Sequence, residues 1–558
     1  MPSGAELFVE TAARLGVATI FTLVGDHLNE VLAVAARRGI RILDMRHESA
    51  VTHAADAWAR IHRKPALSLV TGGPGHTNSL TGIATANLAG SPLIAVSGSR
   101  PSTLAGRQAF QDIDQVAMAR PVVKWAAEVP HAAQIPSYLE RAYAEADSGR
   151  KGAVHLTIPV DLFTADAGTT GPQPCPRPET PESPSHSDDI HRSIGLLRAA
   201  ERPILIAGSG IWWSHAEEAL RRFIELTQIP LYTIAMGRGT VSDDHPLVFG
   251  YADPALNYAV HTAFREADLF LIVGKRIDYR LAMGGARLFP PEARFIQIDI
   301  HPQELGLNRR LDAAICADAR LALEALVDAA GPQPWPPGPG GAPWLDRLRA
   351  LRRDWEATLA QAASDAASPM HPATFCRELR QALPRDVLYS WDGGDFVHWG
   401  RALLPAREPG GWLRLGPLGT IGSSLPNGLA LQLAHPGRPV AVITGDGALG
   451  FYIAEMDTAV RHKLPIVLIV GNDAGWGLER EMQSSAFGGV TVACELQSTP
   501  YDAIMKAFGG GGETIERIDE VRPAVQRAFA SGVPYCLNVK IRGVRSPFTD
   551  WQIAGKKK

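Results

Sequence analysis

The sequence predicts an α/β protein made of three doubly wound, parallel-sheet domains. Short apolar runs rich in Val, Ile and Leu alternate with amphipathic segments, and many of these runs end at glycine or a polar residue. This strand–turn–helix repetition is typical of parallel sheets covered by helices. With 558 residues the chain is too long for one hydrophobic core, and domains of roughly 150–200 residues are expected.

Two stretches rich in Pro, Gly, Ser and Thr divide the chain. The first reads GTTGPQPCPRPETPESPSHSDD and the second GPQPWPPGPGGAP, and such compositions are typical of linkers. The expected organisation is a first domain (1–165), a linker (166–190), a central domain (191–330), a second linker (331–369), a third domain (370–545) and a basic tail (546–558).

The bulk composition excludes several classes of function. Charged residues make up 20% of the chain and the net charge is −3, so no basic surface for nucleic acid or a membrane is expected. The five cysteines form no CxxC pair, which argues against a zinc site or a disulfide framework. The first residues lack a signal-peptide pattern, and no apolar run reaches the ~20 residues that span a bilayer. A cytoplasmic enzyme is therefore expected.

In the first domain, the predicted strands end at residues suited to chemistry. The expected elements are an amphipathic helix at 4–15 and strands at 18–24, 40–44, 66–71, 92–97 and 154–158. The first strand leads into His27, the second into Glu48, and the third into a glycine-rich turn that continues to Asn78. Ligands of open parallel sheets bind beside the carboxyl ends of strands, so these three side chains are candidate site residues.

The central domain reads as a second α/β unit. Its strands are expected at 203–207, 268–273 and 295–299. A dinucleotide-binding dehydrogenase would need GxGxxG after the first strand and an acidic residue about 20 positions later. Gly208-Ser209-Gly210 lacks the third glycine, which argues against a dehydrogenase.

The third domain contains the stretch on which the functional prediction depends. Apolar strands at 440–444 and 465–470 are joined by a helical pattern at 449–462, which predicts a βαβ unit. The first strand ends at Gly445-Asp446-Gly447 and the second at Asn472-Asp473. The aspartates supply hard oxygen ligands, and the glycines let the backbone approach a phosphate. This combination suits Mg²⁺ bound between carboxylates and phosphates.

These two segments resemble the fingerprint of thiamine diphosphate (ThDP) enzymes. The superfamily pattern is GDG followed by NN, and here 24 residues separate Gly447 from Asn472. The resemblance implies ThDP as cofactor, with Mg²⁺ held by Asp446, Asp473 and Gly475. Asp473 stands where the family usually has Asn, which keeps a side-chain oxygen and adds one negative charge.

Further segments resemble the same superfamily, in its order, over nearly the whole chain. Glu48 matches the carboxylate that protonates the aminopyrimidine of the cofactor. Gln111, in an Ala-Phe-Gln segment, matches the glutamine that faces the substrate, and His27 is the candidate to polarise a substrate carbonyl. The residues implied to bind the cofactor are Glu48, Gly75, Asn78, Gly394, Asp395, Phe396, Gly419, Ile421, Gly445, Gly447, Ala448, Asp473, Gly475, Trp476 and Gly477.

Two groups of the superfamily compete as the closer match. Acetolactate synthases share the general plan and the Ala-Phe-Gln segment. However, Val160 and Met482 stand where synthases carry Lys and Trp, and residues 251–253 replace their GMHG segment. Residues 391–396 and 449–451 look more like the 2-hydroxyacyl-CoA lyase and oxalyl-CoA decarboxylase group. The resemblance therefore favours reversible cleavage of a 2-hydroxyacyl-CoA to formyl-CoA and an aldehyde or ketone, with an acetolactate synthase-like reaction as the alternative.

Other readings of the chain are disfavoured. Pyruvate decarboxylase-like proteins carry paired histidines after the fourth strand, where this chain has Gly98-Ser99-Arg100. A catalytically dead ThDP-fold protein usually loses the glutamate, and Glu48 is present.

The resemblance also implies the assembly and the partners. In this superfamily the active site lies between the first domain of one subunit and the third domain of another, so a homodimer or homotetramer is expected. The substrate is expected to be an acyl-CoA, and the central domain holds ADP, another nucleotide or nothing. Residues 546–558, with Phe548 and Trp551 among cations, form either a solvated tail or a lid that meets the CoA phosphates.

Overall fold

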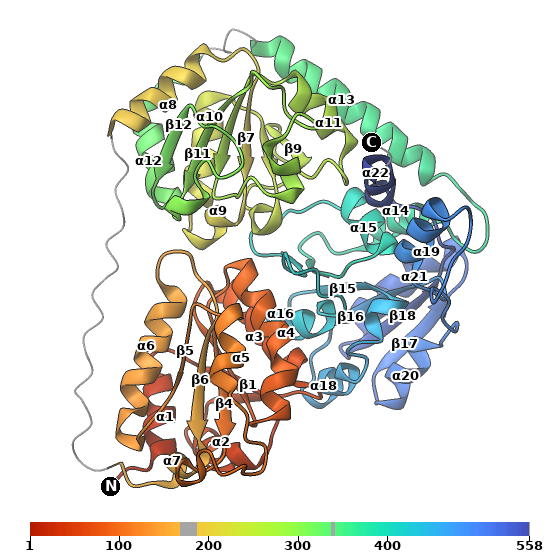
Figure 1. Cartoon of the computed structure of the whole chain (residues 1–558). Coiled ribbons are helices and arrows are strands. Elements are labelled where there is room, and N and C mark those ends of the chain that lie inside the picture. Colours follow the sequence, from red (N-terminus) through yellow and green to blue (C-terminus); the bar gives the residue numbers. More distant parts are fainter. Residues whose placement is uncertain (168–186, 336–340, 557–558) are drawn as a thin grey trace.

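The computed structural model describes residues 1–167, 187–335 and 341–556, and it contains three parallel sheets of six strands each. Figure 1 shows the first domain below, the central domain above and the third domain beside them, each with helices packed around its sheet. The predicted fold class, three α/β domains with parallel sheets, is confirmed.

The first sheet has the strand order β2-β1-β3-β4-β6-β5. Its strands are β1 Thr19–Thr22, β2 Arg41–Asp44, β3 Ala66–Val70, β4 Leu93–Ser99, β5 Trp125–Glu128 and β6 Val154–Pro159. Its helices are α1 Gly4–Arg14, α2 Asn29–Arg37, α3 Glu48–His62, α4 Pro74–Ala89, α5 Gln115–Ala119, α6 Ile135–Asp147 and α7 Val160–Thr164. The sequence analysis missed β5, an edge strand with no fully buried residue and therefore no apolar run.

The third sheet repeats this order strand for strand, as β14-β13-β15-β16-β18-β17. Its strands are β13 Leu388–Trp391, β14 Trp412–Arg414, β15 Val440–Gly445, β16 Val467–Asn472, β17 Gly511–Ile515 and β18 Tyr535–Lys540. Its helices are α14 Pro372–Ala382, α15 Asp395–Leu403, α16 Ser424–Ala434, α17 Asp446–Leu449, α18 Glu455–Arg461, α19 Gly477–Ala486, α20 Tyr501–Ala507, α21 Ile518–Ala530 and α22 Pro547–Lys556.

The central sheet has a different order, β12-β11-β10-β7-β8-β9. Its strands are β7 Pro203–Ala207, β8 Leu231–Thr233, β9 Val248–Tyr251, β10 Leu269–Val273, β11 Arg294–Asp299 and β12 Ala313–Cys316. Its helices are α8 Ser187–Ala199, α9 Ser209–Trp213, α10 Glu217–Thr227, α11 Tyr258–Glu266 and α12 Ala319–Ala330.

The linker predictions fall partly on residues outside the described ranges, namely 168–186 and 336–340. Where the chain is described, helices enter both stretches. Helix α8 begins at Ser187, and the second stretch contains the helix α13, Gly341–Ala362. Buried Trp344, Leu348, Trp355 and Leu359 give α13 an apolar face, which the proline-rich beginning of the stretch hid in the sequence.

The helix predicted at 449–462 is divided into α17 and α18. Residues 450–454 form a turn between them. Tyr452 in this turn is buried, and its hydroxyl lies 2.8 Å from the Ser49 hydroxyl of the first domain. The helical spacing of apolar residues was therefore a correct signal for burial but not for continuous helix.

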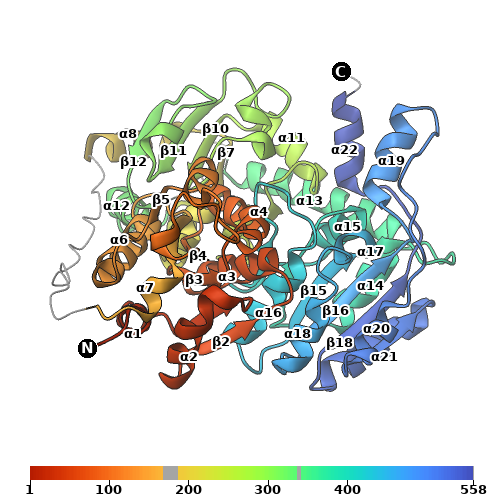
Figure 2. The same cartoon turned by 60° about the horizontal axis from the view of Figure 1, so that its bottom comes forward.

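The C-terminal segment is a packed helix rather than a solvated tail. In α22, the Phe548 ring packs against His398 in a tilted arrangement with centroids 4.1 Å apart, and the guanidinium of Arg287 in the central domain lies over the Trp551 ring. Arg545, just before the helix, pairs with Glu481 at 2.8 Å. Figure 2 shows α22 standing beside α19 at the edge of the molecule.

The first and third domains of the chain share an interface of helices. Helices α3 and α16 pack against each other, and one hydrophobic cluster takes in buried residues of both domains. Arg60 of α3, itself paired with Asp56, donates to the backbone carbonyl of Arg414 at 2.8 Å. No helix among the described residues is long and apolar enough to cross a membrane.

Tight helix–sheet packing in the third domain gives a stability prediction. A Cβ on Gly428 of α16 would lie 2.2 Å from Cγ2 of Val442 in β15. Gly428→Ala should therefore lower the free energy of unfolding by about 1–3 kcal/mol, although alanine is the better helix former. Gly195→Ala in α8 is the matched control, because a Cβ there meets nothing within 4 Å. Denaturant unfolding should show a higher free energy of unfolding for Gly195→Ala than for the wild type. An equal increase in both variants would contradict tight packing at Gly428.

Candidate functional site

Each sheet reverses its strand order beside the first strand of its domain, and the candidate sites lie at these points. The reversal falls between β1 and β3, between β7 and β10, and between β13 and β15. Open α/β sheets bind ligands outside the carboxyl ends of the strands at such points. His27 follows β1, and Asp446 follows β15.

The third-domain cavity, of about 140 Å³, lies at the β13–β15 reversal. Most of the residues predicted for the third domain line it. They are Gly394, Asp395, Phe396, Ile421, Gly445, Asp446, Gly447, Ala448, Asp473, Gly475, Trp476 and Gly477. Gly419 lies in the adjoining turn, where its N–H donates to the Gly416 carbonyl at 3.2 Å.

Asp446 and Asp473 form a pair of interacting carboxylates in this cavity. Asp446 is 2% exposed, and its two oxygens accept the N–H groups of Gly447 and Gly475, each at 3.0 Å. Burial raises the pKa of Asp446. Burial and the nearby charge of Asp446 raise the pKa of Asp473, and Arg480 opposes this shift. Two such carboxylates are costly without a cation, and they are the ligand type that Mg²⁺ prefers.

A cation at this pair needs ligands beyond the side chains. The described parts of the chain contain no group of three or more His, Cys, Asp or Glu side chains that could hold a metal. A diphosphate-bridged Mg²⁺ fits this donor set, because Mg²⁺ usually binds through one or two carboxylates plus substrate phosphates and water.

Glycines let the backbone pass close to the carboxylates. A Cβ on Gly447 would lie 2.8 Å from the Trp476 ring, and one on Gly477 would lie 2.7 Å from a carboxylate oxygen of Asp473. At Gly475 a Cβ would collide with Arg480 and with the Cys494 carbonyl. The loop after β16 therefore tolerates no larger residue without moving.

Glu48 is the first residue of α3 and lies at the edge of the first sheet. It is 8% exposed, and one of its carboxylate oxygens accepts from the Asn78 side chain at 3.0 Å. A Cβ on Gly75 would come within 3.6 Å of the other oxygen. The structure thus brings together Glu48, Gly75 and Asn78, which the sequence had predicted as one group.

His27 lies at the β1–β3 reversal with a defined tautomer. Its Nδ1 accepts the Gly72 N–H at 3.1 Å and lies 2.8 Å from the Thr71 hydroxyl. An accepting Nδ1 leaves the proton of the neutral ring on Nε2. Burial lowers the pKa of His27, which favours this neutral form, and Asp26 opposes the shift.

Gln111 adjoins the glycine turn that follows β3, but a second glutamine, Gln115, holds this turn in place. Gln111 has a φ of 59°, and its Cβ lies against Gly73. Gln115, which is 2% exposed, accepts the Gly73 N–H at 3.0 Å and donates to the Gly98 carbonyl at 3.0 Å. The sequence analysis missed Gln115, because one glutamine in a loop carries no pattern.

Asp392 is a second residue that the sequence analysis did not assign. It is fully buried at the end of β13 and accepts the N–H groups of Gly393 and Gly422. The Ser424 hydroxyl donates to it at 2.5 Å. Asp392 therefore fixes the loop that carries Ile421 to the sheet edge. Its position directly after the apolar run of β13 is the sequence feature that could have identified it.

The chain does not combine the two halves of the predicted site in one cavity. None of His27, Glu48, Asn78 and Gln111 lines the third-domain cavity. Asn78 is exposed and Phe110, beside Gln111, is 85% exposed.

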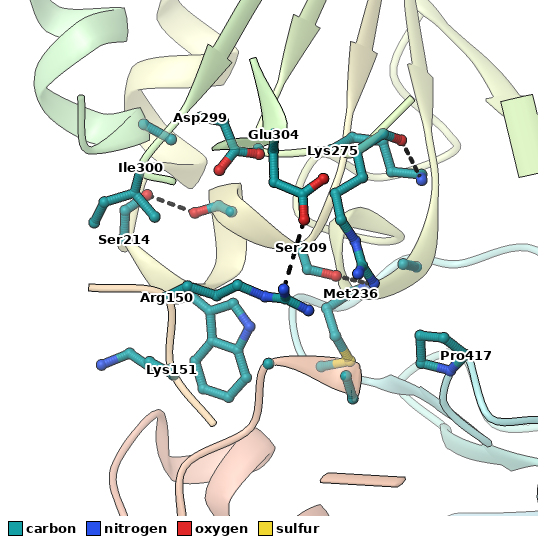
Figure 3. A pocket seen from close by; sticks show the side chains of 18 of the residues that line it. Arg150, Lys151, Ser209, Ser214, Met236, Lys275, Asp299, Ile300, Glu304 and Pro417 are labelled. Carbon is teal, nitrogen blue, oxygen red and sulfur yellow. Dashed lines mark hydrogen bonds and ion pairs between the residues drawn. The ribbon is translucent and has the colours of Figure 1, made fainter. Parts of the chain in front are cut away.

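A second, larger cavity lies at the β7–β10 reversal of the central domain (Figure 3). This central cavity has a volume of about 580 Å³ and is also lined by residues of the first and third domains. Gly210 of α9 lies so close to Gly274 that a Cβ would be 2.5 Å from the Gly274 Cα. The two loops after β7 and β10 therefore pack directly on each other, and both contribute to the lining.

The central cavity carries charges of both signs. Asp299, at the end of β11, has its pKa raised by burial, and Glu304 forms a 3.5 Å ion pair with Arg150 of the first domain. Arg280 and Arg414 are also part of the lining. Arg414 is buried, and its guanidinium donates to the Tyr251 hydroxyl at 3.3 Å. This arrangement suits a ligand with hydroxyl groups at one end and negative charge at the other.

Family models match all three domains. They are the N-terminal TPP binding domain of thiamine pyrophosphate enzymes over residues 2–118, the central domain over 190–326 and the C-terminal TPP binding domain over 392–539. The chain belongs to the thiamine pyrophosphate enzymes. The cofactor prediction, ThDP, is supported by the two TPP binding domains.

Relatives of this thiamine pyrophosphate enzyme carry two kinds of name. A probable acetolactate synthase of Mycobacterium bovis is 35% identical over 94% of this chain and 93% of its own length. The 2-hydroxyacyl-CoA lyase 2 of Caenorhabditis elegans is 31% identical, over 94% of this chain and 87% of its own. The 2-hydroxyacyl-CoA lyase 1 of Mus musculus is 31% identical over 97% of this chain and 94% of its own length. The protein is therefore a ThDP-dependent enzyme that forms or cleaves carbon–carbon bonds.

The carboxylate pair gives a prediction about metal binding. Asp446→Ala should abolish Mg²⁺-dependent ThDP binding, because it removes a ligand and both backbone contacts of that ligand. Asp473→Asn should keep binding, since the amide offers an oxygen. Mg²⁺ affinity of the wild type should increase with pH across the range in which the raised pKa of Asp473 titrates, because the metal needs the ionised form.

The Mg²⁺ affinity of the wild type, Asp446→Ala and Asp473→Asn is measured by titrating Mg²⁺ at fixed ThDP and following tryptophan fluorescence. Asp473→Asn should show the weaker dependence on pH. Loss of the metal in Asp473→Asn with retention in Asp446→Ala would contradict the assigned ligands.

Proposed function

We propose that the protein is a Mg²⁺- and ThDP-dependent carbon–carbon lyase of the 2-hydroxyacyl-CoA lyase type. It would cleave a 2-hydroxyacyl-CoA reversibly to formyl-CoA and an aldehyde or ketone. The observation that carries this choice concerns cations near Gln111. Arg100, which follows β4, lies 3.5 Å from Asp112 and 3.1 Å from Glu128, so its charge is already neutralised.

With Arg100 neutralised in this way, the region around Gln111 fits an aldehyde or ketone better than a second 2-keto acid. The carboxylate of a keto acid needs a free cation, best supplied as a charge-assisted hydrogen bond. Val160, at the beginning of α7, stands where the synthases that the sequence resembles carry Lys. The comparison with lyases at 31% identity is consistent with this choice.

Residues of the chain would hold and activate the cofactor. When bound, ThDP supplies the carbon nucleophile of the reaction. Asp446, Asp473 and the Gly475 carbonyl would bind Mg²⁺ and through it the diphosphate. Glu48 would exchange a proton with the aminopyrimidine, and Asn78, which donates to Glu48, would orient that carboxylate.

Two further residues would act on the substrate. The Nε2–H of neutral His27 would donate to the substrate carbonyl and stabilise the negative charge that develops on its oxygen. Its Nδ1, which accepts from Gly72, fixes the ring for this role. Gln111 would lie beside the reacting carbonyl and select its substituents.

The halves of this site would come from two subunits, in at least a homodimer. The support is the separation of Glu48 from the third-domain cavity and the exposure of Asn78 and Phe110 in the single chain. An exposed aromatic side chain beside a candidate catalytic residue is typical of an interface.

The central cavity would hold an adenine nucleotide such as ADP. Asp299 at the end of β11 is suited to accept from ribose hydroxyls, as acidic residues do in related folds. Arg414 is suited to the phosphates, whereas Arg280 is already paired with Asp253 at 2.6 Å. This role is structural or regulatory, because the cavity lies at a different strand reversal from the third-domain cavity.

The alternative function is that of an acetolactate synthase-like carboligase, which joins two 2-keto acids. It is favoured by the 35% identity to proteins with that name, among them the acetolactate synthase large subunit IlvG of Mycobacterium tuberculosis.

Parallel assays on one preparation decide between the two functions. With ThDP and Mg²⁺ present, kcat/KM for cleavage of a 2-hydroxyacyl-CoA should exceed that for pyruvate condensation by at least ~10-fold, because only the keto acid lacks its cation. Glu48→Gln should lower turnover by ~10²–10⁴-fold with ThDP still bound. A preference for pyruvate would contradict the lyase, and near-normal turnover of Glu48→Gln would contradict the role of Glu48.

A further inference from the structure

Asp395, the first residue of α15, has two carboxylate oxygens in different situations. Oδ1 accepts from the Ser546 N–H at 3.0 Å, from the Ser546 hydroxyl and from the Thr549 hydroxyl at 2.5 Å. Oδ2 is buried and has no hydrogen-bond partner. The residue also lines the third-domain cavity. Thus Oδ1 of Asp395 has all its hydrogen bonds with the beginning of the C-terminal helix, whereas Oδ2 has none.

An ionised carboxylate would be a poor neighbour for a diphosphate. Two anions in a cavity of low dielectric repel strongly. A protonated carboxyl group, in contrast, has one O–H that can donate to a phosphate oxygen. Buried carboxyl groups are known to serve as neutral donors when their surroundings disfavour the charge.

The surroundings of Asp395 disfavour its charge. Burial raises its pKa, the donors Ser546 and Thr549 lower it, and Glu481 of α19 raises it. Several titratable or charged side chains lie on α15 and on the described elements packed against it. Besides Asp395 they are His398 and Arg401 on α15, Cys376, Arg377, Glu378 and Arg380 on α14 with its capping His371, Glu479, Arg480 and Glu481 on α19, Asp550 on α22 with Arg545 before it, and Asp446 after β15. Arg545 is already paired with Glu481.

We propose that Asp395 is a positioning residue that binds the cofactor diphosphate as a neutral carboxylic acid. Its Oδ2–H donates to a phosphate oxygen, while Oδ1 holds the beginning of α22 through Ser546 and Thr549. One side chain therefore links the docking of the C-terminal helix to occupation of the cavity. The inference rests on ThDP occupying the third-domain cavity, as proposed above.

This arrangement predicts a proton taken up on binding. Where the free protein has Asp395 ionised, ThDP can bind only together with a proton. The affinity should then fall about tenfold for each pH unit above the pKa of Asp395 in the free protein. Asparagine at this position keeps the acceptor Oδ1 and donates from its amide at every pH, so it needs no proton.

The test compares the wild type, Asp395→Asn and Asp550→Asn as full chains freed of cofactor. ThDP is titrated at saturating Mg²⁺ between about pH 6 and pH 9, and Kd is read from tryptophan fluorescence, since Trp476 lines the cavity. Calorimetry in two buffers of different ionisation enthalpy gives the protons taken up. At the alkaline end, Asp395→Asn should bind at least ~10-fold more tightly than the wild type and take up about one proton fewer. Asp550→Asn, on the same helix contact but outside the cavity lining, should behave as the wild type.

Ser546→Ala provides a second, independent variant. It removes one hydroxyl donor from Oδ1, which should raise the pKa of Asp395 and move the loss of affinity to higher pH. Equal proton uptake in the wild type and Asp395→Asn, weaker binding of Asp395→Asn at every pH, or no shift in Ser546→Ala would overturn the inference. If the wild type showed no saturable ThDP binding at all, the proposed ThDP site itself would be overturned. This outcome differs from normal ThDP binding without the expected proton uptake, which would overturn only the role of Asp395.

Discussion

The contact between the Asp446 and Asp473 carboxylates is the constraint that shapes the third domain. Removing two like charges from water costs several kcal/mol for each ion unless a cation neutralises them. The fold holds them there nonetheless, with the N–H groups of Gly447 and Gly475 on Asp446 and the guanidinium of Arg480 near Asp473. Glycines give the room that this loop needs. The domain is therefore preorganised for a metal and the phosphates that the metal bridges.

The repeated topology explains why one chain carries two incomplete halves of a site. The first and third sheets have the same strand order, and each places its functional residues at the same reversal. In the first domain that edge carries His27 and a glycine turn near Glu48, and in the third it carries the carboxylate pair. Neither edge has both kinds of residue. We propose that a second subunit completes each site, with the central cavity at a separate strand reversal.

The sequence predicted the features that rest on local rules. Apolar runs ending in Gly-Asp-Gly or Asn-Asp located β15 and β16 closely, because strand ends of a parallel sheet are marked by polar and glycine residues. Residues fixed by contacts between distant segments could not be predicted. Gln115 and Asp392 act through backbone groups of other loops. The packing of helix α22 was not predicted, and its residues were expected to form either a solvated tail or a lid. Its anchors, Ser546 and Thr549, bind a residue about 150 positions away, which the sequence does not reveal.

Subunit complementation tests the central claim, that Glu48 of one subunit serves the carboxylate pair of another. Glu48→Gln and Asp446→Ala chains, each with a different tag, are co-expressed and mixed assemblies are recovered through both tags. Each mixed dimer would contain one site with both residues intact and one with both changed, so the recovered mixed dimers should show about half of the wild-type specific activity, from two nearly inactive parents. Mixed dimers that form but remain as inactive as their parents would contradict a site shared between subunits.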